Sequence, residues 1–379
     1  MRSVASGAGG PPDVARLCQR LARRFRSWAS VAEPEWPAGD FEELALETFR
    51  VQFEHVQPYR AYCRRRGVVP GEVQDWTAVP AVPTAAFRAV DLIAGDPRSA
   101  RLVFRTSGTT RGTDRRGRHL ILEPELYRAS LEAAFRRFVV PDLPAPRMIA
   151  LHPPFEVGED SSLAWMIDAV LARFGDPGSI HAVTTGELEW RRAAEAAARA
   201  AAEGRPVCLL ATTLGFDAWM EWLERHAIRV SLPDGSRAMD TGGSKGRPDL
   251  SRPSVVERMG DRLGLDPSGV INEFGMTELC SQRYAIPGAS GSGPTRFAGP
   301  PWLRTRALDP VTLAPLPEGE EGVLCHFDLA NAGSVSHVLT EDLGRVRGGI
   351  VEWVGRVPGA RPRGCSLATA ELLAAQPDG

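Results

Sequence analysis

Apolar residues recur at helical spacing through the first part of the chain. Between Asp13 and Trp28 they fall three or four positions apart, with arginines on the other face, which predicts an amphipathic helix. The segment from Asp40 to Gly67 continues in the same way and predicts a helical region that breaks near Pro58. We expect residues 1–95 to form a helical lead-in that packs on the core.

Continuous apolar runs alternate with helical patterns in the middle of the chain. Arg147 to His152 and Val207 to Thr213 are typical of buried strands. Three amphipathic segments predict helices that follow such strands: 161–174, 187–203 and 216–226. Strands that alternate with helices indicate a mostly parallel sheet with helices on both faces. We therefore predict an α/β core over residues 96–295.

The pattern changes after Tyr284. Residues 286–301 are rich in Gly, Pro and Ser, and the runs that follow are short, strand-like and divided by Pro and Gly. This pattern predicts a small β subdomain over residues 296–355, followed by a C-terminal arm over residues 356–379.

Composition narrows the class of protein. The 379 residues are 43% hydrophobic and carry a formal net charge of −2, so no global field attracts nucleic acid or an anionic membrane. No apolar run has the length of a bilayer crossing. The six cysteines form no C-x-x-C pair, which fits a reducing compartment, and we expect a cytoplasmic protein. The oligomeric state stays open.

The densest chemistry lies in the stretch Phe104–Gly112. Glycines let a backbone approach an anion closely, and hydroxyls and amide groups then donate to it. Such a stretch is typical of a loop that leaves a strand and binds a nucleotide triphosphate. A polar surface turn is the other interpretation, and composition alone does not decide between them.

Three segments together resemble the adenylate-forming enzymes, a superfamily that includes acyl-CoA synthetases. The stretch Thr106–Gly112 resembles their phosphate loop, Asn272–Glu278 their aromatic-Gly-x-Thr-Glu loop, and Thr340–Gly344 their ribose-binding segment. Gly355-Arg356 resembles the Gly-Arg before their hinge, and Met239–Ser244 stands where they carry an adenine loop. The segments occur in the superfamily's order.

Within the superfamily, the closer resemblance is to the LuxE-type acyl-protein synthetases of bacterial bioluminescence. It rests on Asn272–Gln282, Glu159–Trp165 and Arg363–Leu367. It implies ATP-dependent activation of a fatty acid, transfer of the acyl group to a cysteine near the C-terminus, and hand-over to an acyl reductase or an acyl-carrier protein. The expected fold is the N-terminal domain of these enzymes without their lysine-bearing lid domain.

The resemblance also implies roles for single residues. Glu278 would bind Mg²⁺, Thr277 would touch the α-phosphate, Phe274 would stack on adenine and Asp342 would accept the ribose hydroxyls. The predicted ATP contacts are Thr106, Ser107, Gly108, Thr109, Thr110, Arg111, Gly112, Gly242, Gly243, Glu273, Phe274, Gly275, Met276, Asp342 and Arg356. Ordinary structural roles stay open for each: a helix cap for Glu278, a core aromatic for Phe274, a turn for Asp342 and a surface arginine for Arg356.

Cys365 is the predicted acyl acceptor. A buried structural cysteine is the ordinary interpretation of a single cysteine. Arg361 and Arg363 stand beside it, and cationic neighbours favour the thiolate, which is the nucleophilic form. We therefore predict an AMP-forming carboxylic acid ligase that acylates this thiol. The rivals are a phenylacetate-CoA-ligase-like enzyme that acylates coenzyme A or an amine, and a silent nucleotide-binding subunit of a reductase complex.

Overall fold

The computed structural model describes residues 10–31, 36–37, 39–106, 116–158, 160–184, 187–242, 250–286, 294–357 and 363–375. The chain forms two compact units, and each is described by itself. Unit 1 comprises residues 1–133, 276–282 and 294–379, and unit 2 comprises residues 134–275 and 283–293. The two units are defined by the contacts within the chain. The division predicted from the sequence, into segments 1–95, 96–295, 296–355 and 356–379, stays a prediction.

Unit 2 is built on a mostly parallel sheet with the strand order β11-β10-β9-β8-β4-β5. Five neighbouring strands are parallel: β4 (Arg147–Ala150), β5 (Ile180–His181), β8 (Val207–Thr212), β9 (Arg237–Thr241) and β10 (Val270–Phe274). The edge strand β11 (Arg283–Ala285) runs antiparallel to β10. The chain reverses its direction of progress across the sheet between β4 and β8, which is a topological switch point.

Helices connect the parallel strands of unit 2, as crossovers require. They are α5 (Ser162–Phe174), α6 (Trp190–Ala202), α7 (Thr213–Arg225) and α8 (Arg252–Leu263). A short antiparallel pair, β6 (Val183–Thr184) and β7 (Glu187–Leu188), precedes α6, and the 3-10 turn η5 (Pro267–Gly269) precedes β10. The predicted strands and helices of this region are confirmed, except that residues 187 and 188, which were expected to begin a helix, form β7.

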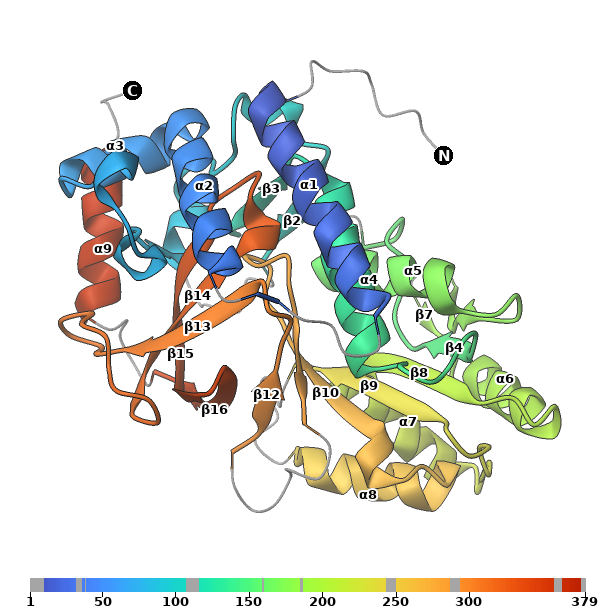
Figure 1. Ribbon diagram of the computed structural model, residues 1–379. Coiled ribbons are helices and arrows are strands. Elements are labelled where there is room, and N and C mark those ends of the chain that lie inside the picture. The colour runs from blue at the N-terminus through green and yellow to red at the C-terminus, as the bar shows by residue number, and fades with distance from the viewer. Residues whose placement is uncertain are drawn as a thin grey trace. The chain divides into compact units, whose positions relative to one another are not determined.

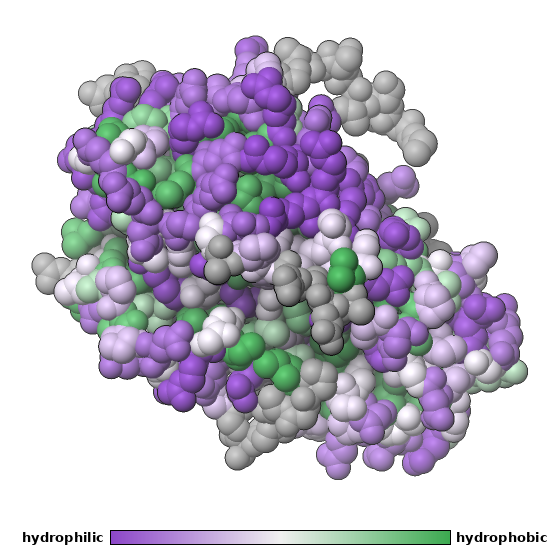
Figure 2. Space-filling view, in the orientation of Figure 1, coloured by the Kyte–Doolittle hydropathy of each residue, from purple (hydrophilic) through white to green (hydrophobic). Residues whose placement is uncertain are grey.

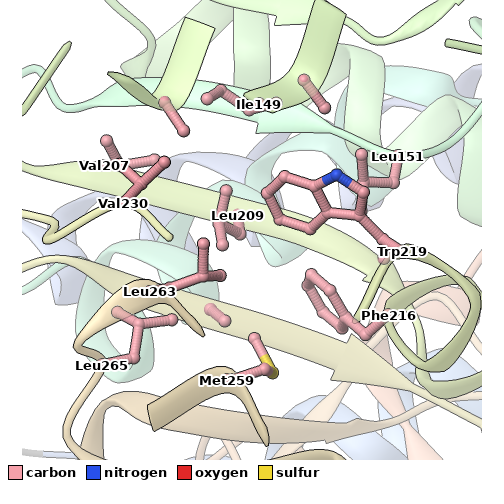
Figure 3. Packing of buried hydrophobic residues seen from close by; sticks show 14 of the residues in the cluster. Ile149, Leu151, Val207, Leu209, Phe216, Trp219, Val230, Met259, Leu263 and Leu265 are labelled. Atoms are coloured by element: carbon pink, nitrogen blue, oxygen red, sulfur yellow. The ribbon is translucent and has the colours of Figure 1, made fainter. Parts of the chain in front are cut away.

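The core of unit 2 lies between the sheet and helices α6 to α8 (Figure 3). Trp219 of α7 is fully buried in it, in a cluster that includes the strand residues Ile149 and Leu209. Met148 and Leu210, which neighbour those strand residues in sequence, are also fully buried, so both faces of the strands are covered. This burial on both faces explains the continuous apolar runs in the sequence.

Unit 1 contains an antiparallel sheet with the strand order β13-β14-β15-β16-β12. Its strands are β12 (Arg296–Ala298), β13 (Leu303–Leu308), β14 (Glu321–Asp328), β15 (His337–Arg347) and β16 (Ile350–Arg356). The short strand β1 (Val82–Pro83) adds to β15 in parallel. A separate hairpin joins β2 (Leu102–Arg105) to β3 (Arg118–Ile121).

The helices of unit 1 come from both ends of the chain (Figure 1). They are α1 (Pro12–Ala29), α2 (Asp40–His55), α3 (Gln57–Arg65), the first part of α4 (Pro124–Phe138) and α9 (Arg363–Ala374). The predicted break near Pro58 is confirmed, because α2 ends at His55 and Pro58 lies in the first turn of α3. Short 3-10 turns complete the unit: η1 (Pro70–Glu72), η2 (Trp76–Ala78), η3 (Thr84–Arg88), η4 (Pro97–Ser99) and η6 (Leu329–Asn331).

Helix α1 shows how the sequence pattern becomes packing. Most of its apolar residues are buried, and Phe25 stacks on Trp302 with ring centroids 4.0 Å apart. Its arginines at 16, 20, 23 and 26 are exposed, and the surface over α1 is mainly hydrophilic (Figure 2). None of the helices in the described ranges is long and apolar enough to cross a membrane.

Candidate functional site

The predicted phosphate loop lies between β2 and β3, two paired antiparallel strands, and the next helix, α4, comes only after β3. Strand β3 follows it and pairs with β2, with Arg105 opposite Arg118. At the base, the Thr106 amide donates to Gly117 O at 3.0 Å, and the Gly117 amide donates to Thr106 Oγ1 at 2.9 Å. The other predicted contacts of this loop lie outside the described residues: Ser107, Gly108, Thr109, Thr110, Arg111 and Gly112.

The segment that carries Thr277 and Glu278 is held by buried side chains of unit 1. His119 Nδ1 donates to Thr277 O at 2.7 Å, and Asn331 Nδ2 donates to Glu278 O at 2.8 Å. The next turn is fixed by Asp328, whose carboxylate accepts the Cys280 amide at 2.9 Å. The main chain on both sides of the Glu278 side chain is therefore anchored.

Glu278 is a buried carboxyl group near two arginines. Burial raises its pKa to about 7, and the charge of Asp342 adds to the rise, whereas Arg356 and Arg88 oppose it. Within the described ranges, no other residue forms a hydrogen bond or ion pair with this carboxylate. A buried hard-oxygen ligand beside a second carboxyl suits a divalent cation such as Mg²⁺.

Asp342 lies on β15 directly opposite Arg356 of β16. Arg356 Nε donates to Asp342 Oδ1 at 3.2 Å, and Trp353 Nε1 donates to the same oxygen at 3.4 Å. Burial raises the pKa of Asp342, and Arg356 opposes the rise. The pairing of β15 with β14 shifts between Cys325 and Val323, so the strand bulges at the residues before and around Asp342. Bulges of this kind re-aim side chains next to binding sites.

Unit 1 therefore brings together several residues predicted from separate motifs. Glu278, Asp342 and Arg356 lie within electrostatic reach of one another. Sequence reasoning missed Arg88, whose positive charge opposes the rise in the pKa of Glu278, and it missed Trp353, which donates to Asp342. Arg88 follows the proline-rich connection and lies near the hairpin base, since a Cβ on Gly117 would lie 3.3 Å from Arg88 Cγ.

Unit 2 holds the other predicted nucleotide contacts. Gly242 follows β9 with φ +78°, and Gly243 lies outside the described residues. Glu273 on β10 is buried and accepts a hydrogen bond from Thr241 Oγ1. Burial raises the pKa of Glu273 to about 7; Thr241 opposes the rise and Asp240 adds to it. Phe274 is half-buried and Gly275 is exposed, whereas Met276, which is also half-buried, already belongs to unit 1.

Asp240 is a buried charge of unit 2 that sequence reasoning did not single out. Arg252 Nη2 donates to Asp240 Oδ1 at 2.7 Å, and Asn272 Nδ2 and Thr213 Oγ1 donate to Oδ2 at 3.0 and 2.8 Å. This network ties the ends of β8, β9 and β10 together. It supports the backbone that leads to Gly242.

Cys365 is buried on α9, which differs from the accessible thiolate that its arginine neighbours suggested. It packs in an apolar cluster with Leu308, Cys325 and Leu339, and its Sγ lies 3.5 Å from Thr340 O. Arg361 lies outside the described residues, as does the side chain of Arg363. The acceptor role of Cys365 stays a prediction.

Comparison with known proteins decides the family. Residues 181–374, which are just over half of the chain, match the family model described as "Acyl-protein synthetase, LuxE". The chain belongs to the LuxE family. The match spans Glu273 to Glu278, Asp342, Arg356 and Cys365, so this LuxE chain carries most of its predicted site within the family's own region; Thr106 lies before it.

Two curated relatives support the assignment to LuxE. A long-chain-fatty-acid–luciferin-component ligase of Vibrio harveyi is 24% identical over 354 residues, which cover 89% of each chain. A ligase of the same name from Aliivibrio fischeri is 35% identical over 83 residues, or 20% of this chain and 22% of the relative. The predicted enzyme class, an ATP-dependent carboxylic acid ligase, is confirmed by these findings.

Solved structures show the fold of this LuxE chain. An open conformation of 2-hydroxyisobutyryl-CoA ligase, in complex with 2-HIB-AMP and CoA, matches with a TM-score of 0.61 and 16% identity, over 85% of this chain and 76% of that one. The same ligase in its thioesterification state matches with a TM-score of 0.60 and 15% identity, over 84% and 69%. The predicted α/β fold of the adenylate-forming enzymes is confirmed.

Proposed function

We propose that this protein activates a long-chain fatty acid with ATP and Mg²⁺ and then passes the acyl group to a thiol. The main support is the convergence of Glu278, Asp342 and Arg356 in unit 1. Family membership supports the same reading. The relatives' name supplies the class of acid, because both are long-chain-fatty-acid ligases.

The first step joins the acid to AMP. An oxygen of the carboxylate attacks the α-phosphorus of ATP, and the bond from that phosphorus to the β-phosphate oxygen breaks, so that acyl-AMP forms and pyrophosphate leaves. Such a displacement depends on positioning and charge stabilisation. Asp342 would accept the ribose hydroxyls, and Arg356 and Arg88 would offset phosphate charge. Thr106 would donate its hydroxyl to the phosphates, and Thr277 would contact the α-phosphate.

Glu278 would hold Mg²⁺. Its carboxylate is buried, and no other described residue forms an ion pair or a hydrogen bond with it, so the chemistry of the ligand fits a hard cation. When bound, the ion would neutralise charge that develops on the phosphate oxygens. The residues of unit 2 in the predicted set, Gly242, Glu273 and Phe274, are proposed nucleotide contacts as well.

The second step transfers the acyl group to sulfur. The thiolate attacks the acyl carbon, the bond to the AMP oxygen breaks, and a thioester and AMP result. We propose Cys365 as this thiol. Because its side chain is only 2% exposed, acylation requires that α9 leave the apolar cluster around Cys325 and Leu339. An acyl reductase or an acyl-carrier protein would then accept the acyl group from the thioester.

The burial of Cys365 also favours a second candidate. An external acceptor, such as coenzyme A or an amine, would need no movement of α9. In that case the protein is a phenylacetate-CoA-ligase-like enzyme, and Cys365 is a core residue.

Intact-mass measurement distinguishes these readings. The wild type, Cys365→Ala and the matched control Cys325→Ala are incubated with ATP, Mg²⁺ and fatty acids of several lengths. We expect a hydroxylamine-sensitive acyl adduct on the wild type and on Cys325→Ala, and no adduct on Cys365→Ala. In parallel incubations with added coenzyme A, acyl-CoA formation by Cys365→Ala at the wild-type rate would support the external acceptor. Failure of every acid to support pyrophosphate exchange would indicate a silent nucleotide-binding subunit.

A further inference from the structure

A small cavity in unit 1 is lined by the two side chains, His119 and Asn331, that hold the carbonyl groups of Thr277 and Glu278. Its volume is about 10 Å³, and all of its lining residues belong to unit 1. Among them are His119, Asn331 and Cys280, with Leu122 and Gly333. Space of this size holds about one water molecule.

His119 presents a bare ring nitrogen in this region. Its Nδ1 must carry the proton, because it bonds to a carbonyl oxygen, Thr277 O. Burial lowers the pKa of His119 to about 4, so the ring is neutral near pH 7 and Nε2 is a lone-pair acceptor. This Nε2 is buried and has no hydrogen-bond partner among the described residues.

Asn331 presents a second acceptor. Its Nδ2 donates to Glu278 O at 2.8 Å and to Val335 O at 3.1 Å, so both amide protons are used and the orientation of the amide is fixed. Its Oδ1 is buried, and no partner for it occurs in the described part of the chain. Both side chains are 1% exposed. A buried acceptor without a donor is costly, on the order of 1–3 kcal/mol in general.

We propose that one structural water occupies this cavity and donates one proton to His119 Nε2 and the other to Asn331 Oδ1. A water molecule can donate both of its protons, and it would supply one to each of these two unpartnered acceptors. The water would link the two side chains that hold the carbonyl groups of Thr277 and Glu278. His119 and Asn331 are then positioning residues for the Glu278 carboxylate, a role whose functional part depends on the proposed ligase activity.

The presence of the water can be tested on the wild-type protein by two measurements that need no activity assay. A crystal structure that resolves ordered waters should show density within hydrogen-bonding distance of both His119 Nε2 and Asn331 Oδ1. Nitrogen-15 NMR of the histidines should show His119 as the Nδ1-protonated tautomer from pH 8 down to pH 5. A dry cavity, a proton on Nε2, or a monovalent cation revealed by anomalous density after soaking in rubidium would each overturn the proposal.

The positioning role is tested with variants. His119→Phe and Asn331→Leu should raise the Mg²⁺ concentration that half-saturates fatty-acid-dependent pyrophosphate exchange by about 10- to 100-fold. His119→Asn retains a donor near the position of Nδ1 and should recover part of the loss. The matched control is His326→Phe, another buried histidine of unit 1, whose Nδ1 is 2.7 Å from Thr305 Oγ1. It should leave the Mg²⁺ dependence unchanged.

The outcomes separate this proposal from the proposed function. An equal change in His119→Phe and in the control would reduce His119 to a residue of general stability and overturn the positioning role. If the wild type shows no exchange with any acid, the proposed function fails, while the crystal structure and the NMR spectrum still decide the water. If a variant does not fold, the same two wild-type measurements decide it.

Discussion

Two buried glutamates close together in the chain, Glu273 and Glu278, both have a raised pKa but lie in different surroundings. Burial raises the pKa of each to about 7. Glu273 accepts a hydrogen bond from Thr241, which satisfies it within the protein. Glu278 instead lies near Arg88, Arg356 and Asp342, where a ligand can still change its charge state. A perturbed carboxyl of the second kind is typical of functional sites.

Replacement of Glu278 by Gln tests this difference. The change keeps the shape and removes the negative charge, so Mg²⁺-dependent pyrophosphate exchange should fall by about 10- to 100-fold. Because the carboxylate is the ligand form, the Mg²⁺ affinity of the wild type should weaken as the pH falls below about 7. The variant should lose that part of the pH profile.

The control for this change is Glu72→Gln, which alters an exposed carboxyl of unit 1. It should keep both the rate and the pH profile of the wild type. Steady-state exchange measured from pH 5.5 to pH 8.5 at several Mg²⁺ concentrations gives both quantities. An unchanged Mg²⁺ requirement in Glu278→Gln would remove Glu278 from the metal site.

At the scale of elements, the sequence predicted the helices and strands whose pattern depends only on residues close together in the chain. The apolar runs at 147–152 and 207–213 became β4 and β8, because a strand buried on both faces needs only its own side chains to be recognised. The hairpin partner β3 was missed, since its pairing with β2 depends on a register that no local pattern encodes.

The burial of Cys365 could not be read from the sequence for the same reason. Its neighbours Leu308, Cys325 and Leu339 come from three strands distant in the chain. The grouping of Glu278 with Asp342 and Arg356 was predictable because the motifs carry it. The raised pKa values were not, because burial is a property of the folded chain.

The seating of α9 predicts the reactivity of Cys365. Gly364 lies in the first turn of this helix, next to the turn at 309–313, and its amide donates to Pro310 O at 3.2 Å. A Cβ at Gly364 would lie 2.6 Å from Leu313 Cγ, so Gly364→Ala must displace the helix or the turn. We expect alkylation of native Cys365 by iodoacetamide to become faster, by about tenfold if the substitution costs about 1.4 kcal/mol of docking.

Peptide mass spectrometry would assign the alkylated site, since all six cysteines are buried. Ser366→Ala is the matched control, because Ser366 is an exposed position of the same helix and its alkylation rate should equal that of the wild type. Equal rates for Gly364→Ala and the wild type would show that the docking of α9 does not control access to this thiol.

At the scale of the whole molecule, buried carboxyls and buried histidines oppose each other in their effect on stability. The pKa of Asp328 is raised by burial to about 6, and Glu273 and Glu278 titrate near 7. The folded state thus holds protons that the unfolded state releases, and stability falls as the pH rises through this range. Burial lowers the pKa of His119 and His337 to about 4 and about 3. Between these values and the ordinary histidine pKa of about 6.5, the unfolded state binds more protons, so the histidines make stability rise with pH.

A difference measurement isolates the carboxyls from the histidines. The double variant Glu273→Gln, Glu278→Gln lacks two carboxyl groups that are protonated in the folded wild type at pH 5. At pH 8 each of these groups either ionises in its buried site or keeps its proton, and both destabilise the folded wild type. Its free energy of unfolding relative to the wild type should therefore increase as the pH rises towards 7. Above pH 7 the total increase should be at most about 3 kcal/mol for each group. Urea titrations in EDTA at pH 5, 6, 7 and 8 measure it, with Glu72→Gln as the control. The histidines are present in both proteins, so their contribution cancels in the difference. A difference that does not change with pH would mean that both glutamates ionise normally in the fold. Glu278 would then need no cation to hold its charge.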